Sequence, residues 1–315
     1  MRAGTDLSAD PLSETLALID ARCVLSRGLV AGGAWAMRFS PPGRLKITAV
    51  VRGSCRLTLD GTERTVPLVA GDVVVFNGGN SFVLAGGPAA RPVDASAAFA
   101  ASPGPVADLG QGRDTVFVGG HIDLGPAGDE LLVQALPPLI HVRATADEAP
   151  VLRWLLDRIL QEMTTGRAGS GFASDQLSQL VFVQVLRTYL ADSQALPAGW
   201  LRALADERIA PALRLMHSDP GHPWQLGELA RSAAMSRTAF ATRFKAVAGV
   251  PPLTYLTDWR MRLARRALRE EDTPLSALAR SLGYTSESAF STAFKRAVGV
   301  APKRYRDTAR GSGRQ

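Results

Sequence analysis

Cysteine, histidine and long apolar runs are what this chain of 315 residues has least of. Its two cysteines, Cys23 and Cys55, are too few for a disulfide framework or, by themselves, for a zinc finger. A run of about eighteen apolar residues, the length of a membrane span, occurs nowhere. The polar N-terminal residues also lack the apolar core of a signal peptide. These absences predict a protein of the reducing cytoplasm that does not enter a membrane.

The net charge of +7 is distributed unevenly along the chain. Residues 201–315 hold twenty Lys or Arg against ten Asp or Glu, whereas residues 1–200 hold sixteen against nineteen. A basic tail behind a neutral-to-acidic front is typical of a protein in which one half meets a polyanion and the other does not. Nucleic acid is therefore the expected partner of the C-terminal part.

The N-terminal part has short apolar or alternating segments separated by Gly, Pro and Asn, which is typical of a β-sandwich or small barrel. Asp60-Gly61 is a strong hairpin signal within it, and residues 86–112 are expected to form a loop. The predicted strands cover residues 35–39, 45–51, 55–59, 66–69, 73–76, 82–84 and 115–124.

Apolar residues then recur at helical spacing over residues 151–163 and 177–190. Two amphipathic helices with a short connection predict an antiparallel pair. Their apolar faces pack either on the β domain alone or also on a second copy of the chain.

The C-terminal part contains an internal repeat. The segment Leu229-Ala230-Arg231-Ser232 returns forty-nine residues later as Leu278-Ala279-Arg280-Ser281. After one extra residue, Phe240, Phe244-Lys245 and Gly249-Val250 return fifty residues later as Phe290, Phe294-Lys295 and Gly299-Val300. Each copy has the pattern of a short helix, a tight turn and a second helix.

In the first copy, residues 226–233 form the first helix, residues 234–235 the turn, and Ser236 is the expected N-cap of the second helix. In the second copy, residues 275–282 form the helix, Gly283 the turn, and Thr285 or Ser286 the cap. Each second helix has an apolar stripe that must face a small core, formed by Phe240, Phe244 and Val247 and by Phe290, Phe294 and Ala297.

The opposite face of each second helix carries small polar side chains and ends in a lysine, which suits a helix in a major groove. The alternative is a generic helical repeat with solvated faces, but two copies are too few for a solenoid and the basic excess is concentrated here. The predicted DNA-binding residues are Ser236, Arg237, Thr238, Ala241, Thr242, Lys245, Ser286, Glu287, Ser288, Ser291, Thr292 and Lys295.

These motifs resemble the AraC/XylS-type DNA-binding domain over about residues 207–308. The segments that resemble this domain are residues 224–240, 244–245 and 249–252 in the first half, residues 260–264 in the joining helix, and residues 282–290, 294–295 and 299–306 in the second half. The resemblance implies that the helices after Ser236 and Thr285 are recognition helices entering successive major grooves. Ala241 and Thr242 stand where relatives often place Gln or Arg, so Arg237 and Lys245 are expected mainly to hold phosphates.

Residues 67–82 are similar to the second motif of cupin barrels and to the cupin-type sensor domain that precedes AraC-type DNA-binding domains. Metal-dependent cupins need several His and a carboxylate, but Phe82 stands at the would-be ligand position and no His-x-His occurs. His121 and Asp123 could be imagined as metal ligands, but alternate residues of one strand are more often neighbours without a binding role. We expect no metal, no cofactor and no catalytic residues.

Two features of the front domain bear on how it receives a signal. Cys23 follows Arg22, whose charge favours a thiolate and makes Cys23 a candidate redox residue, although two buried small apolar side chains are the simpler interpretation. An inward-facing set lines either an effector cavity or an ordinary core. Its expected members are Trp35, Met37, Phe39, Ile47, Val51, Leu57 and Leu59.

The sequence thus predicts an α+β multidomain protein: a cupin-like β-barrel sensor domain over residues 1–145, a helical pair for dimerisation with a linker over 146–200, and an all-α domain with two helix-turn-helix units over 201–315. The expected function is that of a sequence-specific DNA-binding transcription regulator, by resemblance an activator, that acts as a homodimer and responds to a small-molecule or redox signal through the N-terminal domain. Its expected partners are double-stranded promoter DNA, RNA polymerase and an unknown small-molecule effector. The alternatives are a cupin-type metalloenzyme with a vestigial DNA-binding tail and a nonspecific architectural DNA binder.

Overall fold

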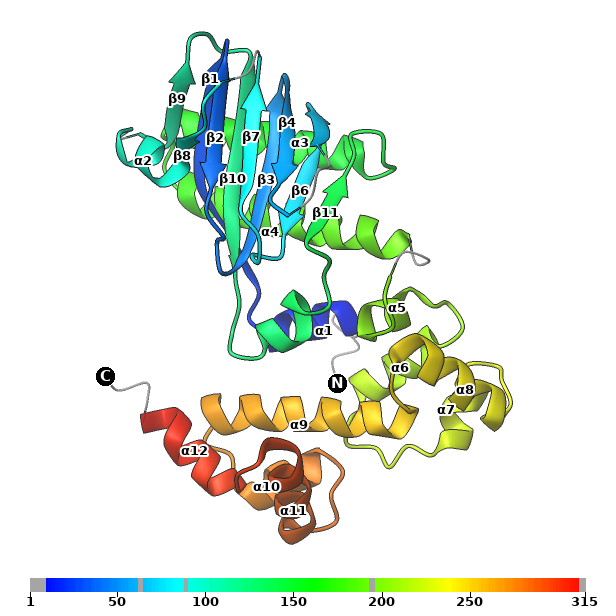
Figure 1. Cartoon of the computed structure of the whole chain (residues 1–315). Helices are drawn as coiled ribbons and strands as arrows, with labels where there is room; N and C mark the ends of the chain where they lie inside the picture. Colours follow the sequence, from blue (N-terminus) through cyan, green and yellow to red (C-terminus); the bar gives the residue numbers. More distant parts are fainter. Residues whose placement is uncertain (1–9, 62–64, 88–89, 103, 193–195, 312–315) are drawn as a thin grey trace. The chain divides into compact units, whose positions relative to one another are not determined.

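The computed structural model describes residues 10–61, 65–87, 90–102, 104–192 and 196–311, which form two compact units (Figure 1). The N-terminal unit comprises residues 20–192, and the C-terminal unit comprises the residues up to 19 together with those from 193 onward. The helical pair predicted as a separate segment over 146–200 therefore packs with the strands. Residues 10–19, predicted as part of the barrel, pack with the helices of the C-terminal unit.

The N-terminal unit is built from two mixed sheets (Figure 1). Only the β1–β9 and β2–β8 pairs are parallel among the described strands. The six-stranded sheet has the order β11 (Leu139–Val142), β6 (Val73–Phe76), β3 (Leu45–Arg52), β10 (Thr115–Asp123), β1 (Arg22–Gly32), β9 (Val106–Gly110). The five-stranded sheet has the order β5 (Thr65–Val69), β4 (Ser54–Leu59), β7 (Phe82–Gly86), β2 (Trp35–Phe39), β8 (Val93–Asp94).

The prediction of a loop over residues 86–112 is wrong. This segment contains β8, helix α2 (Ala95–Ala100) and β9. Asp94 caps α2 by accepting a hydrogen bond from the backbone N–H of Ala97 at 3.0 Å, and β9 pairs along β1. The segment is rich in Ala, Gly and Pro, so its order comes from this pairing and capping and was not visible in local propensity.

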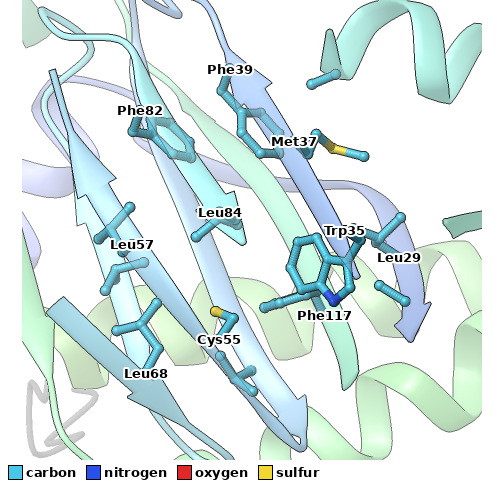
Figure 2. Packing of buried hydrophobic residues seen from close by; sticks show 14 of the residues in the cluster. Leu29, Trp35, Met37, Phe39, Cys55, Leu57, Leu68, Phe82, Leu84 and Phe117 are labelled. Carbon is cyan, nitrogen blue, oxygen red and sulfur yellow. The ribbon is translucent and has the colours of Figure 1, made fainter. Parts of the chain in front are cut away.

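The core of the N-terminal unit lies between the two sheets (Figure 2). Phe82, which stands at the position of a cupin metal ligand, is fully buried there and stacks on Phe39 and Phe76 with ring centroids 4.6 and 3.9 Å away. The predicted inward set is correct for Trp35, Met37, Phe39, Leu57 and Leu59.

The predicted inward set is wrong for Ile47 and Val51. On β3, Thr48 and Val50 share the inner face with Lys46, because side chains alternate along a strand and Val50 belongs to the inner core. Ile47 instead packs toward the helices α3 (Ala149–Thr165) and α4 (Ser170–Ala191).

Helices α3 and α4 form the predicted pair and cover the face of the six-stranded sheet that points away from the core (Figure 1). Gln179 of α4 is fixed to β1: its side-chain carbonyl accepts from the Cys23 N–H at 2.9 Å and its amide donates to the Ala21 carbonyl at 3.1 Å. A short π-helix, Asp129–Val133, precedes β11. No helix among the described residues is long and apolar enough to span a membrane.

The C-terminal unit is all-helical, and the predicted fold class is confirmed. It has two small cores, one centred on Phe240 and Phe244 and the other on Phe290 and Phe294. Helix α9 contributes side chains to both cores and so joins them. Its helices are α1 (Pro11–Leu18), α5 (Trp200–Ala205), α6 (Ala210–Ser218), α7 (Leu226–Ser232), α8 (Arg237–Ala248), α9 (Pro252–Glu270), α10 (Leu275–Ser281), α11 (Glu287–Val298) and α12 (Pro302–Gly311).

A buried histidine fixes α1 to this unit. The Nδ1 atom of His217 lies 3.0 Å from a Glu14 carboxylate oxygen, and its Nε2 atom lies 2.8 Å from the Tyr255 hydroxyl. The imidazole also stacks on Trp259 with centroids 4.0 Å apart. Burial lowers the pKa of His217, and the nearby Glu14 opposes that shift only in part.

Candidate nucleic-acid interface

The two copies of the repeat fold into two helix-turn-helix units, α7–α8 and α10–α11. In the first turn Ala234 has a φ of 52°, and in the second Gly283 has a φ of 79°. The next N–H donates back into the preceding helix in both copies: Met235 to the Ala230 carbonyl and Tyr284 to the Ala279 carbonyl, each at 2.9 Å. The two turns therefore have the same geometry although their residues differ.

The second helix of each unit begins and ends in the same way. The hydroxyl oxygen of Ser236 accepts from the Ala239 N–H at 3.2 Å, and that of Ser286 accepts from the Ala289 N–H at 3.1 Å. Ser286 is thus the cap that the sequence left open between two residues. Both helices contain twelve residues and are followed by a glycine with positive φ. These local signals place the two helices without help from distant contacts.

The inner stripe of each helix is nearly as predicted. Phe240, Phe244 and Val247 are buried in the first helix, and Phe290 and Phe294 are buried in the second. Ala297 was predicted in the second stripe, but it is exposed and Val298 packs against the core in its place. The reason is that the last turn reads Val247-Ala248 in the first helix but Ala297-Val298 in the second, so the larger side chain stands one position later.

The outer faces of α8 and α11 correspond position by position. The paired residues, fifty apart, are Arg237 with Glu287, Thr238 with Ser288, Ala241 with Ser291, Thr242 with Thr292 and Lys245 with Lys295. Of the predicted DNA-binding residues, Ala241 and Ser291 are half-buried and the others, the caps Ser236 and Ser286 included, are exposed. The structure thus brings the predicted residues together on two equivalent helix faces.

One pair on these faces was missed by the sequence argument. Ala246 and Arg296 are exposed and follow the two lysines at equivalent positions. The second helix therefore ends in two adjacent cations, Lys295 and Arg296, whereas the first ends in one. The sequence could have shown this difference, because the fifty-residue offset of the repeat aligns Ala246 with Arg296.

Two other arginines of the first unit are held within the unit. Arg243 is half-buried and its guanidinium donates to both carboxylate oxygens of Asp206 at 3.1 and 2.7 Å. The guanidinium of Arg237 lies across α7, because a Cβ added to Gly227 would come within 2.9 Å of its Nε atom. Arg237 remains exposed to solvent, so it is positioned by α7 and still available to a phosphate.

Several arginines of the joining helix α9, which add to the basic excess of the C-terminal part, make contacts within the unit. Arg260 donates to the carbonyls of Pro220 and His222 at 2.6 and 2.8 Å. Arg266 pairs with Glu270 at 2.8 Å, and Arg269 donates to the Tyr305 hydroxyl at 3.1 Å. Arg260 and Arg269 thus connect α9 to other segments of the C-terminal unit, whereas Arg266 pairs within α9 itself.

The histidines and carboxylates of the N-terminal unit pair with each other in small groups. Within the described part of the chain, three or more His, Cys, Asp or Glu side chains nowhere gather in a way that would hold a metal ion. His121 lies 3.3 Å from Asp123, and its pKa is lowered by burial and by the charge of Arg44. His141 lies 3.0 Å from Asp72, a buried carboxylate that also accepts from the Ala144 N–H.

The expectation that Arg22 favours a thiolate at Cys23 is wrong. Arg22 is exposed and pairs with Asp20 at 3.0 Å, while Cys23 is buried under α4. Burial, with a smaller contribution from Asp175, raises the pKa of the Cys23 thiol to about 12. Burial raises the pKa of Cys55 to about 12 as well. Both thiols are therefore protonated at neutral pH, which disfavours fast reaction with oxidants.

Comparison with known proteins assigns a family to each unit. Residues 10–191 match a family profile described as Cupin, and residues 229–308 match one described as Helix-turn-helix domain. A Streptomyces lividans protein described as an AraC-like transcription regulator is 42% identical over 297 residues, covering 94% of this chain and 98% of its own length.

Two further relatives match this chain along most of their own length. A Streptomyces antibioticus protein with the same description is 43% identical, again covering 94% of this chain and 98% of its own length. The HTH-type transcriptional regulator AlkR of Acinetobacter baylyi is 32% identical over 286 residues, covering 87% of this chain and 91% of its own length.

Proposed function

The chain belongs to the AraC-like transcription regulators, and from that premise we propose that it binds discrete promoter sites by placing α8 and α11 in successive major grooves of double-stranded DNA. The observation that carries this proposal is the matched pair of exposed helix faces, each fixed by a serine cap on one side and two buried phenylalanines on the other. Successive major grooves on one face of DNA lie ~34 Å apart.

The two helices are proposed to recognise different bases. Thr238, Thr242, Ser288 and Thr292 are short donors and acceptors at positions that reach base edges. Glu287 is suited to accept from a cytosine amino group, and its counterpart Arg237 is suited to a phosphate or a guanine. The lysines and Arg296 at the helix ends are proposed to hold phosphates, which fix the orientation of the domain on DNA without reading sequence.

The N-terminal unit is proposed to receive a small-molecule signal and to support a homodimer that activates transcription with RNA polymerase. Four large apolar side chains are exposed on the helical pair: Val151, Trp154, Phe172 and Leu180. Val151 and Trp154 lie one turn apart on α3, and Phe172 and Leu180 lie about two turns apart on α4. Each helix thus has a pair of exposed apolar side chains at helical spacing, and we call each pair an apolar stripe. A second copy of the chain is the proposed occupant of these stripes.

Nuclease footprinting on the promoter regions of the source genome tests this function. A regulator protects discrete sites with two half-sites, whereas a nonspecific architectural binder protects DNA uniformly. A cupin-type metalloenzyme with a vestigial tail would protect nothing and would carry about one metal ion per chain. Uniform or absent protection by the full chain overturns the proposal.

A further inference from the structure

A cavity of about 240 Å³ lies between the two sheets of the N-terminal unit. Its walls are largely apolar and come from both sheets and α2, through Leu29, Phe39, Leu84, Phe99 and Phe117. Figure 2 shows Leu29, Phe39, Leu84 and Phe117 directed into the space between the sheets. Gly119 of β10 lines the cavity without a side chain, and a Cβ added there meets no atom closer than 3.6 Å.

Two cationic side chains reach this apolar space. Lys46 lines the cavity from β3, and its ammonium lies 4.9 Å from the centroid of the Phe39 ring. None of the described carboxylates pairs with it. Burial, followed by the charge of Arg44, lowers the pKa of Lys46. A carboxylate bound beside this ammonium would offset both effects, because opposite charges stabilise each other strongly where water is excluded.

Arg27 lines the same cavity from β1. Its guanidinium donates to the backbone carbonyls of Phe99 and Ser102, at 2.9 and 2.5 Å. These contacts hold the end of α2 over the cavity, but carbonyl groups do not neutralise a positive charge. Arg27 therefore adds to the positive potential at the wall while keeping a fixed position.

Asp123, an acidic residue at this end of the sheet, already has two partners. Asp123 of β10 is paired with Arg44 at 3.2 Å and with His121 at 3.3 Å. In the register of the sheet, His121 lies directly opposite Lys46. Among the described residues that line the cavity, two are cationic, Arg27 and Lys46, and none is a carboxylate.

We propose that this cavity binds a small carboxylate with an apolar body, its negative charge held by Lys46 beside Arg27 and its body enclosed by the phenylalanines. A cavity of about 150 Å³ is known to hold benzene, so 240 Å³ accommodates one ring with a short side chain, or a straight chain of about eight carbons. This inference rests on the proposed role of the N-terminal unit as a sensor and names the chemical class of its effector.

Calorimetric titration of the full chain with two acids and their amides tests the assignment. The probes are 3-phenylpropanoate and octanoate, with 3-phenylpropanamide and octanamide as neutral partners of the same shape. We expect each acid to bind about tenfold more tightly than its amide or better, because a charge-assisted contact in an apolar site exceeds a neutral one by that order.

Variants distinguish the contribution of the Lys46 charge to binding from that of the cavity volume. Lys46→Gln is expected to remove the preference for the acid while leaving amide affinity within about twofold, and Lys46→Arg to keep most of the preference. Gly119→Val fills the cavity and is expected to weaken acids and amides alike. The matched control is Arg113→Gln, which removes an exposed cation of the same unit that pairs with Asp108 and is expected to change nothing.

Acids that bind no more tightly than their amides, or a preference that survives Lys46→Gln in a protein with unchanged melting temperature, overturn the inference. Failure of both acids to bind overturns it as well. Gel-shift titration of the same preparations with promoter DNA keeps the two proposals distinguishable. A protein that binds its DNA site but neither acid refutes the ligand class alone, and one that binds the acids but no DNA site refutes the proposed function alone.

Discussion

Ala234 and Gly283 occupy the same turn position in the two helix-turn-helix units, and both have backbone φ angles in the left-handed region, 52° and 79°. An alanine in this conformation costs roughly 1–2 kcal/mol more than a glycine. Gly283 is under a further constraint, because a Cβ there would lie 2.3 Å from the Gly221 carbonyl oxygen and 2.8 Å from the Arg260 guanidinium. The two copies of the repeat therefore tolerate different residues at one position.

Replacing Gly283 with Ala is expected to destabilise the C-terminal unit by more than the ~1–2 kcal/mol that left-handed geometry alone costs. The control is Gly299→Ala, since Gly299 has a φ of 86° but open space around its Cβ position. Urea denaturation followed by circular dichroism compares the two. Equal losses of stability would contradict the close approach between Gly283 and Gly221.

Core and surface residues of the recognition helices are expected to behave in opposite ways. Phe290→Ala should destabilise the second helix-turn-helix unit by ~3–5 kcal/mol, because the ring fills a small core. Thr292→Ala, on the exposed face, should leave thermal melting unchanged and weaken binding to the specific site by ~1–3 kcal/mol if it contacts a base edge. The measurements are melting curves alongside titrations on specific and scrambled DNA. A melting temperature lowered by Thr292→Ala with specific binding intact would show that the wrong face was assigned.

The cations at the end of α11 are expected to set the salt dependence of DNA binding. Lys295→Ala and Arg296→Ala should each weaken binding to all sequences and reduce the slope of log affinity against log salt by ~1, because each phosphate contact releases about one counterion. Arg266→Ala is the control, since Arg266 is already paired with Glu270. An unchanged slope in both α11 variants would exclude them from the phosphate contacts.

The buried His217 is expected to make the C-terminal unit sensitive to acid. Its pKa in the folded protein is lowered by burial, so below about pH 6.5, the ordinary histidine value, the unfolded chain binds a proton that the folded one does not. Stability contributed by the neutral imidazole is therefore present above that pH and lost as the pH falls toward the folded pKa. His217→Gln should reduce this dependence in urea denaturation at pH 7.5 and 5.5. A variant as acid-sensitive as the parent would rule out His217 as the source.

Self-association through the helical pair is expected to depend on the exposed apolar stripes. Trp154→Glu and Leu180→Glu should convert a dimer into a monomer at micromolar concentration without unfolding it, because both side chains are exposed, at 59% and 50%, and a buried glutamate at an interface is strongly unfavourable. Analytical ultracentrifugation measures the change, with Arg113→Glu on a different surface as the control. A parent protein that is monomeric both free and on DNA would remove the prediction.

Much of the C-terminal unit was determined by the sequence itself, because its signals are local. The repeated phenylalanines, the serine caps and the glycines after each helix act within one or two turns. The sequence alone could therefore identify Ser236 as a helix cap and Phe240, four residues later, as a core residue. The fifty-residue offset likewise paired the outer faces of the two helices.

Only the tertiary structure decided which way β3 faces and what surrounds its charged residue. Nearly all of β3 is buried, either between the sheets or under α3 and α4, so apolar residues occur on both faces and alternation gives no direction. Ile47 was placed in the interior by its apolarity, whereas Lys46 is the residue that lines the cavity. The same holds for Cys23, where the neighbouring Arg22 suggested a low pKa and burial under α4 raises it. The pKa of a side chain depends on burial and on neighbouring groups that are distant in sequence, and these neighbours come together only when the chain has folded.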